Sequence, residues 1–198
     1  MISIEKLPKG RWHLMPVPRV QPLQSGQYTL FQSALFWVTR RAAKARQDLN
    51  VFPTFARLGA AFPPYLWFLS HILNKGQIPG PDKSRIILRA GWRLGCVYEW
   101  VHHVHRGRDF GLTEAEIASF ATEGVSELWS ERTRAFVKAV DELIANQNMS
   151  DQTWDCLRQH LTEDQMVEFC MLVGHYIMVA IMNNTLGIQV EPEFEQLP

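Results

Sequence analysis

The sequence is poor in cysteine, in net charge and in long apolar runs, and each scarcity excludes a class of protein. Its 198 residues include only 3 cysteines, and no two of these have the Cys-x-x-Cys spacing. A disulfide framework is therefore not expected, and a reducing cytoplasm fits best. No run of about 18 apolar residues occurs, so no membrane-spanning helix is expected. The N-terminus also lacks the apolar region of a secretory signal.

The charges balance, with 20 Lys plus Arg against 20 Asp plus Glu. A neutral chain is a poor partner for nucleic acid or for an anionic membrane surface. It also offers little repulsion between copies, which permits self-association. With a hydrophobic fraction of 46%, the chain is long enough to bury one sizeable core.

Alternating strand patterns are also missing, whereas apolar residues recur at the three- and four-residue spacing of helices. The sequence therefore predicts an all-α protein. Asp82 is expected to cap one helix, and Thr113 with Glu116 and Thr162 with Gln165 form capping boxes for two others. The predicted helices cover residues 28–46, 51–59, 63–75, 82–94, 96–111, 113–123, 130–146, a short stretch from 150, and 163–184.

The domain organisation is expected to be simple. Residues 1–24 contain Pro8, Pro16, Pro18 and Pro22, which predicts an irregular arm rather than a separate unit. We expect this arm to pack against a surface, with a neighbouring subunit as one candidate. Residues 25–198 are expected to form a single helical domain.

The segment from Cys96 to Arg108 carries the best functional clue. If it is helical, each residue turns by about 100°. Taking Cys96 as zero, Glu99 then lies near about 300° and His103 near about 340°, whereas His105 lies near about 180°. A thiol, a carboxylate and an imidazole on one face can form a proton-transfer relay.

Each of the three groups also has a structural interpretation. Cys96 at a helix N-terminus is either an activated thiol or a small apolar residue at a tight helix entry. Glu99 between Tyr98 and Trp100 is expected to be half-buried, which raises the pKa of a carboxyl towards the useful range for acid–base chemistry. Its structural alternative is an ion pair with His103 or with one of two arginines on the preceding helix, Arg89 and Arg93.

Other chemically active residues are weaker candidates. His102 follows Glu99 at the Glu-x-x-His spacing of di-iron bundles, but no second copy of that motif occurs, so no metal site is expected. His105 is expected at the surface. His175 and Tyr176 either line the same pocket or are hydrogen-bonded core groups. Cys156 and Cys170 are expected to be structural.

The motifs resemble those of a known family. The stretch from Pro81 to His103 contains the Tyr98-Glu99-Trp100 core with a histidine four residues after the glutamate, and Gly111-Leu-Thr-x-x-Glu-Ile follows. Together these resemble the carboxymuconolactone decarboxylase family, which includes the alkylhydroperoxidase D (AhpD)-like proteins. A weaker likeness extends over residues 50–190. The resemblance implies an AhpD-like helical bundle that assembles into dimers, trimers or hexamers.

The resemblance also relates residues of this chain to two branches of the family. In the peroxidase branch, Cys96 matches the first cysteine of Cys-x-x-Cys and His103 matches the histidine. Glu99 replaces the second cysteine, and Ser84 stands where that branch has a glutamate. Without a thiol at position 99, a dithiol–disulfide cycle within the motif cannot run. The chain is more similar to the decarboxylase-like branch.

That branch implies a cofactor-free enzyme that transfers protons and removes carbon dioxide from a small carboxylated or lactone substrate. His103 would move the proton while Glu99 orients it. Arg89 or Arg93 would hold the substrate carboxylate, with Tyr98, Trp100 and His102 beside the substrate. Three alternatives remain open: a single-cysteine peroxidase, a metal-dependent oxygenase with iron or manganese at Glu99 and His102, and a non-catalytic oligomeric protein.

Overall fold

A computed structural model describes residues 7–194, and nearly all its regular structure is helical. Within that range the extended structure is limited to one isolated bridge between His13 and Cys96. The helices are α1 (Leu30–Ala42), α2 (Val51–Phe55), α3 (Phe62–Asn74), α4 (Gly80–Arg93), α5 (Val97–Asp109), α6 (Glu114–Ser119), α7 (Glu131–Asn146), α8 (Asp151–Leu157) and α9 (Glu163–Leu186), with short 3-10 helices η2 (Ser25–Gln27), η3 (Ala56–Ala61) and η4 (Pro192–Phe194).

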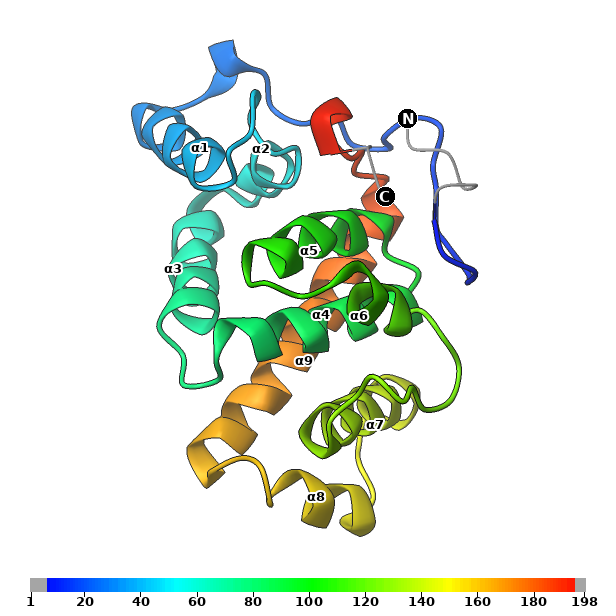
Figure 1. Ribbon diagram of the computed structural model, residues 1–198. Helices are drawn as coiled ribbons and strands as arrows, with labels where there is room; N and C mark the ends of the chain where they lie inside the picture. Colours follow the sequence, from blue (N-terminus) through cyan, green and yellow to red (C-terminus); the bar gives the residue numbers. More distant parts are fainter. Residues whose placement is uncertain (1–6, 195–198) are drawn as a thin grey trace.

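Helices α4, α5 and α9 form the centre of the molecule (Figure 1). Helix α4 packs against α5, α7 and α9, and α7 packs against α8. Helices α1 and α2 lie at one end of the molecule and α7 and α8 at the other, with α3 along one side (Figure 1). Within this centre, α5, which carries the predicted relay, lies on the side that faces α1 and α2. The all-helical prediction is confirmed.

Several predicted helix ends were wrong. The helices predicted over residues 28–46 and 113–123 are shorter, at Leu30–Ala42 and Glu114–Ser119. Helix α4 begins at Gly80, with Pro79 rather than Asp82 as the capping residue, because Asp82 forms ion pairs with Arg85 and Arg132. The helix predicted over residues 51–59 is interrupted at Gly59, which has a φ of 61°. Helix α2 already ends at Phe55, the chain continues as the 3-10 helix η3, and the positive φ of Gly59 interrupts η3.

The two predicted capping boxes differ in outcome. At the start of α9 the box is complete, because Thr162 Oγ1 accepts from Gln165 N and Gln165 Oε1 accepts from Thr162 N. At the start of α6 only half of it forms. Thr113 Oγ1 accepts from the backbone N–H of Glu116, but the Glu116 carboxylate accepts from Arg85 Nε at 2.8 Å instead of returning to the cap.

Residues 7–24 are largely irregular and pack on their own chain. His13 N donates to Gly95 O at 2.9 Å, and Arg19 N donates to Leu186 O at 2.8 Å. The indole of Trp12 lies 5.7 Å from that of Trp100. The arm therefore covers the start of α5 and the end of α9. A neighbouring subunit is not needed to hold it there.

Helix α9 is a long, apolar helix. Among the described residues it is the one helix whose length and composition would suffice to cross a membrane, with a mean hydropathy of 1.6 over an 18-residue window. Within that window, 44% of the residues are buried inside the fold. A helix at the core of a folded domain has the same composition, so this finding is weak evidence for a membrane span.

Candidate functional site

The start of α5 is fixed by a glycine and a buried cysteine. Gly95 has a φ of 60°, and a Cβ atom there would lie 2.1 Å from Arg11 O, so only glycine fits. Cys96 follows as the extended N-cap of α5 and is fully buried. Burial, and secondly the nearby charge of Glu99, raises the pKa of the Cys96 thiol to about 12. The thiol therefore stays protonated near neutral pH.

Glu99 lies on the first turn of α5 and is only 8% exposed. Its Oε1 accepts a hydrogen bond from Asn183 Nδ2 of α9 at 2.8 Å. Its Oε2 lies 3.8 Å from His103 Nε2. Burial raises the pKa of this carboxyl to about 7, although His102 and Asn183 act in the opposite direction. Glu99 is thus a buried acid that exchanges its proton near neutral pH.

His103 is the neighbour of Glu99 on the same face of α5. Its Nε2 forms a hydrogen bond of 3.1 Å with the hydroxyl of Tyr176 on α9. Burial, assisted by the positive charges of Arg106 and His102, lowers the pKa of His103 well below its usual value. The imidazole is therefore neutral at pH 7, and Glu99 and His103 do not form a charged pair there. The structure brings the two side chains together as the helical spacing predicts.

A second buried carboxylate, Glu191, lies beside α5 and was not identified from the sequence. It is fully buried and accepts hydrogen bonds from Asn50 N at 2.6 Å, from the Tyr98 hydroxyl at 2.8 Å and from His102 Nε2 at 2.7 Å. Burial opposes its ionisation, but the bonds from His102 and Asn50 lower its pKa overall. A single glutamate in a short C-terminal segment gives no sequence signal for this role.

A cavity of about 190 Å³ opens onto this face of α5. Helices α1, α2, α3 and α9 contribute to its wall, together with Phe194 of η4. Ala42 and Asp109, which are exposed, lie at its rim. Its lining includes Glu99, His103, His175, Tyr176, Tyr65 and Arg106. His105, which was expected at the surface, is half-buried and also lines it.

Some of the predicted site residues do not line the cavity. Tyr98 and His102 line it, but both are bonded to Glu191. Cys96 and Trp100 do not line it. Cys96 lies behind Glu99, with its Sγ 3.8 Å from Asn183 Nδ2. A larger hollow of about 620 Å³, between α7, α8 and α9, contains none of the predicted site residues.

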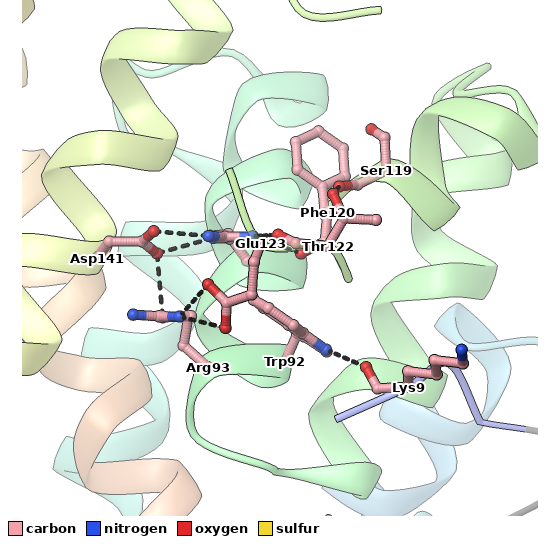
Figure 2. A network of polar contacts seen from close by, with 9 residues as sticks. Lys9, Trp92, Arg93, Ser119, Phe120, Thr122, Glu123 and Asp141 are labelled. Carbon is pink, nitrogen blue, oxygen red and sulfur yellow. Dashed lines mark hydrogen bonds and ion pairs between the residues drawn. The ribbon is translucent and has the colours of Figure 1, made fainter. Parts of the chain in front are cut away.

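Arg89 and Arg93 lie in a separate network and do not line the cavity. Arg89 is 1% exposed and forms two bonds to Asp141, of 2.7 and 2.6 Å. It also donates to the backbone carbonyls of Phe120 and Thr122. Asp141 joins this guanidinium to that of Arg93, which also pairs with Glu123. Figure 2 shows the contacts of Arg93 with Asp141 and Glu123. The structure gives these arginines a role in packing α4 against α7.

The sequence left open a metal ion bound by Glu99 and His102. Within residues 7–194, no three His, Cys, Asp or Glu side chains converge as a metal site would require. His102 points to Glu191 at 2.7 Å. The two side chains of the Glu-x-x-His motif therefore bond to different partners: Glu99 to Asn183, and His102 to Glu191.

The raised pKa of Glu99 predicts a pH-dependent stability. The folded state holds the Glu99 proton up to a pH of about 7, whereas the unfolded chain releases it near 4.5. Between these values the folded state binds more protons, so the free energy of unfolding falls as pH rises. The full difference corresponds to about 3 kcal/mol above pH 7. Glu99→Gln should abolish this loss, so the variant should be more stable than wild type at pH 8 and similar at pH 4.5.

Urea denaturation of both proteins across this pH range measures the effect. Glu123→Gln is the matched control, because Glu123 is exposed and its substitution should give a difference that does not change with pH. A Glu99→Gln difference that is equally flat would show that the carboxyl titrates normally.

Comparison with known proteins gives one family match and several similar folds. Residues 57–142, which include α3 to α6 and most of α7, match the model of the carboxymuconolactone decarboxylase family. No curated protein sequence matches the chain significantly. A solved structure of an AhpD core, from an uncharacterized peroxidase-related protein of Ralstonia eutropha JMP134, superimposes with a TM-score of 0.80 at 17% identity, covering 93% of this chain and 99% of that one.

Two further structures share the fold. The debrominase Bmp8 superimposes with a TM-score of 0.72 at 17% identity, covering 88% of this chain and 93% of its own. A protein of unknown function from Agrobacterium tumefaciens, a putative antioxidant defence protein AhpD, has a TM-score of 0.64 at 23% identity, covering 69% of this chain and 95% of its own. At these identities the likeness concerns the fold alone.

Proposed function

We propose that this chain is a member of the carboxymuconolactone decarboxylase family, whose model matches residues 57–142, and that it is a cofactor-free proton-transfer enzyme that decarboxylates a small carboxylated or lactone substrate. One observation carries the proposal. Glu99 is a buried carboxyl with a pKa of about 7, and it faces a cavity large enough for a small molecule. A general acid or base is most effective when its pKa lies near the working pH.

In this mechanism Glu99 carries the proton, whereas the sequence favoured His103. The bond from the substrate carbon to its carboxylate breaks, carbon dioxide leaves, and the electron pair moves into the conjugated lactone carbonyl. The Glu99 carboxyl then protonates the ring carbon and regains its own proton from solvent. Asn183 fixes the carboxyl through Oε1. His103, neutral and bonded to Tyr176, is suited to positioning the substrate rather than to releasing a proton.

Arg106 is the best candidate to hold the substrate carboxylate. It lines the cavity, and among the described residues no carboxylate lies within 4.0 Å of it. Arg89 and Arg93 are committed to Asp141 and Glu123. A guanidinium that is not already paired can bind an anionic substrate without breaking an existing ion pair.

The size of the cavity indicates a substrate with one small ring. Benzene fits an engineered cavity of about 150 Å³, and this cavity is slightly larger, at about 190 Å³. A related fold is known with such a ligand, since a cysteine-to-alanine variant of the debrominase Bmp8 has been solved in complex with 2,3,4-tribromopyrrole.

The alternatives receive less support. A single-cysteine peroxidase needs an accessible thiolate, whereas Cys96 is fully buried and its pKa is raised to about 12. Cys156 and Cys170 are exposed, and neither lines the cavity beside Glu99. A non-catalytic protein would need no cavity at Glu99. All three thiols are free, which agrees with the cytoplasmic location that we propose.

The experiment that tests the function is a panel of small lactone acids and alkyl hydroperoxides. We expect carbon dioxide release from at least one lactone acid, with deuterium from heavy water at the ring carbon and a pH profile that bends near 7. Peroxide consumption with oxidation of Cys96, and no carbon dioxide release, would favour the peroxidase. A headspace assay and mass spectrometry of the product measure the two outcomes.

We also propose that the protein is a homo-oligomer, assembled through α9. This helix presents an exposed row at alternating spacings of four and three residues, formed by Val167, Met171, Gly174, Met178 and Ile181. That is the spacing of a coiled-coil seam, which is complementary to a second copy of itself. A Cβ at Gly174 would meet no atom within 4 Å, so another helix can approach closely there.

Light scattering after size-exclusion chromatography tests this assembly. We expect wild type to be a dimer or larger, and the double variant Met171→Glu, Met178→Glu to be a monomer, because four like charges would meet in a dimeric seam. Gln152→Glu, at an exposed position on α8, should leave the assembly intact. A monomeric wild type would contradict the proposal.

A further inference from the structure

His175 is a buried histidine whose polar atoms the mechanism does not yet use. It lies on α9, is 5% exposed, and among the described residues neither of its ring nitrogens has a hydrogen-bond partner. Aromatic rings hold it in place. The ring of Tyr65 stacks on the imidazole, with the two ring centres 5.7 Å apart. The rings of Phe68 and Tyr176 meet it edge to face, with centre-to-centre distances of 5.4 and 5.3 Å. A buried donor without a partner costs about 1–3 kcal/mol, so this imidazole is expected to bind a group in the cavity.

The side chain is placed to do so, because it lines the same cavity as Glu99. Burial lowers the pKa of His175 to about 4, which makes the ring neutral at pH 7. A neutral imidazole offers one N–H donor and one acceptor. It is therefore suited to a carbonyl or hydroxyl group rather than to a second carboxylate.

His175 and Arg106 contact α3 at separate positions. His175 contacts Phe68, and Arg106 Nη2 donates to Asn74 Oδ1 at 3.4 Å. Phe68 and Asn74 are both on α3, six positions apart, which corresponds to about 9 Å along the helix. His175 and Arg106 therefore contact different parts of α3, so a ring bound between them can meet His175 on one side and Arg106 on the other.

We propose that His175 is a specificity-determining residue, which hydrogen-bonds a carbonyl or hydroxyl on the side of the substrate ring opposite to the carboxylate held by Arg106. The substrate class is thus a small ring acid with a second polar group across the ring. This inference rests on the proposed function, because it assigns a role in the same cavity.

Calorimetric binding of two unreactive probes, 4-hydroxybenzoate and benzoate, tests it. They differ by one hydroxyl opposite the carboxylate. Wild type should prefer 4-hydroxybenzoate by about fivefold, the worth of one hydrogen bond. His175→Phe should bind both acids equally. His175→Gln, which keeps a donor and an acceptor, should retain part of the preference, and it replaces the first variant if that one fails to fold.

His71→Phe is the matched control. His71 is on α3 outside the cavity lining, so this variant should keep the full preference. Equal binding of the two probes by wild type, no binding of either, or a preference that survives in His175→Phe would overturn the role of His175. Because the probes do not react, a binding result that contradicts the role of His175 does not contradict the proposed proton transfer by Glu99. Glu99→Gln, conversely, should keep the preference even if the catalytic proposal fails.

Discussion

Glu99→Gln should lower the rate of carbon dioxide release by about 10²- to 10⁴-fold, the usual contribution of a general acid or base. The amide retains the size of the side chain and can still accept the hydrogen bond from Asn183, which the carboxyl accepts at 2.8 Å. It cannot deliver a proton to the ring carbon. The rate should therefore fall while the binding of ring acids changes little.

Two variants make this result specific. Glu99→Asp keeps the acid but withdraws it by one methylene, so partial activity with a shifted pH profile is expected. Glu116→Gln alters a carboxylate that pairs with Arg85 away from the cavity, and it should leave the rate unchanged. Full activity of Glu99→Gln, measured by the headspace assay on the same lactone acid, would remove Glu99 from the mechanism.

Arg89→Met should lower the free energy of unfolding by about 3–5 kcal/mol, as is typical when one partner of a buried ion pair is removed. The substitution leaves Asp141 without its two strongest bonds and leaves the carbonyls of Phe120 and Thr122 without this donor. It also removes the guanidinium that lies 4.6 Å from the ring of Trp92. Methionine refills part of the volume, so the loss arises mainly from unpaired polar groups.

Arg93→Met is the control for this prediction. Arg93 is 28% exposed, its partner Glu123 is 77% exposed, and its contact with Asp141 is longer than those of Arg89, at 3.4 Å. Such partly exposed pairs contribute about 0–1 kcal/mol. Urea denaturation at pH 7 compares the two variants. The double variant Arg89→Met, Asp141→Leu should recover part of the loss, because no charge is then left unpaired. Equal stability of the two single variants would mean that the Arg89 network is weakly coupled to the fold.

The sequence by itself determined the helices and the placement of the relay face. Apolar spacing and the Thr162–Gln165 capping box are local properties, and α9 begins where they predict. The spacing of Glu99 and His103 is one helical turn, so any helix there brings the two side chains together. The family resemblance could be recognised for the same reason, because its motif lies within a single continuous segment.

Only the tertiary structure decided which side chains face the cavity and which protonation states they hold. Asn183, Glu191 and Arg106 are unremarkable in the sequence, yet the fold places two of them against α5 from distant parts of the chain. Arg89 was predicted to bind a substrate carboxylate, but it is buried in an ion pair with Asp141. The pKa of Glu99 depends on burial by α9 and on partners that no local pattern reveals, because desolvation is a property of the packed core.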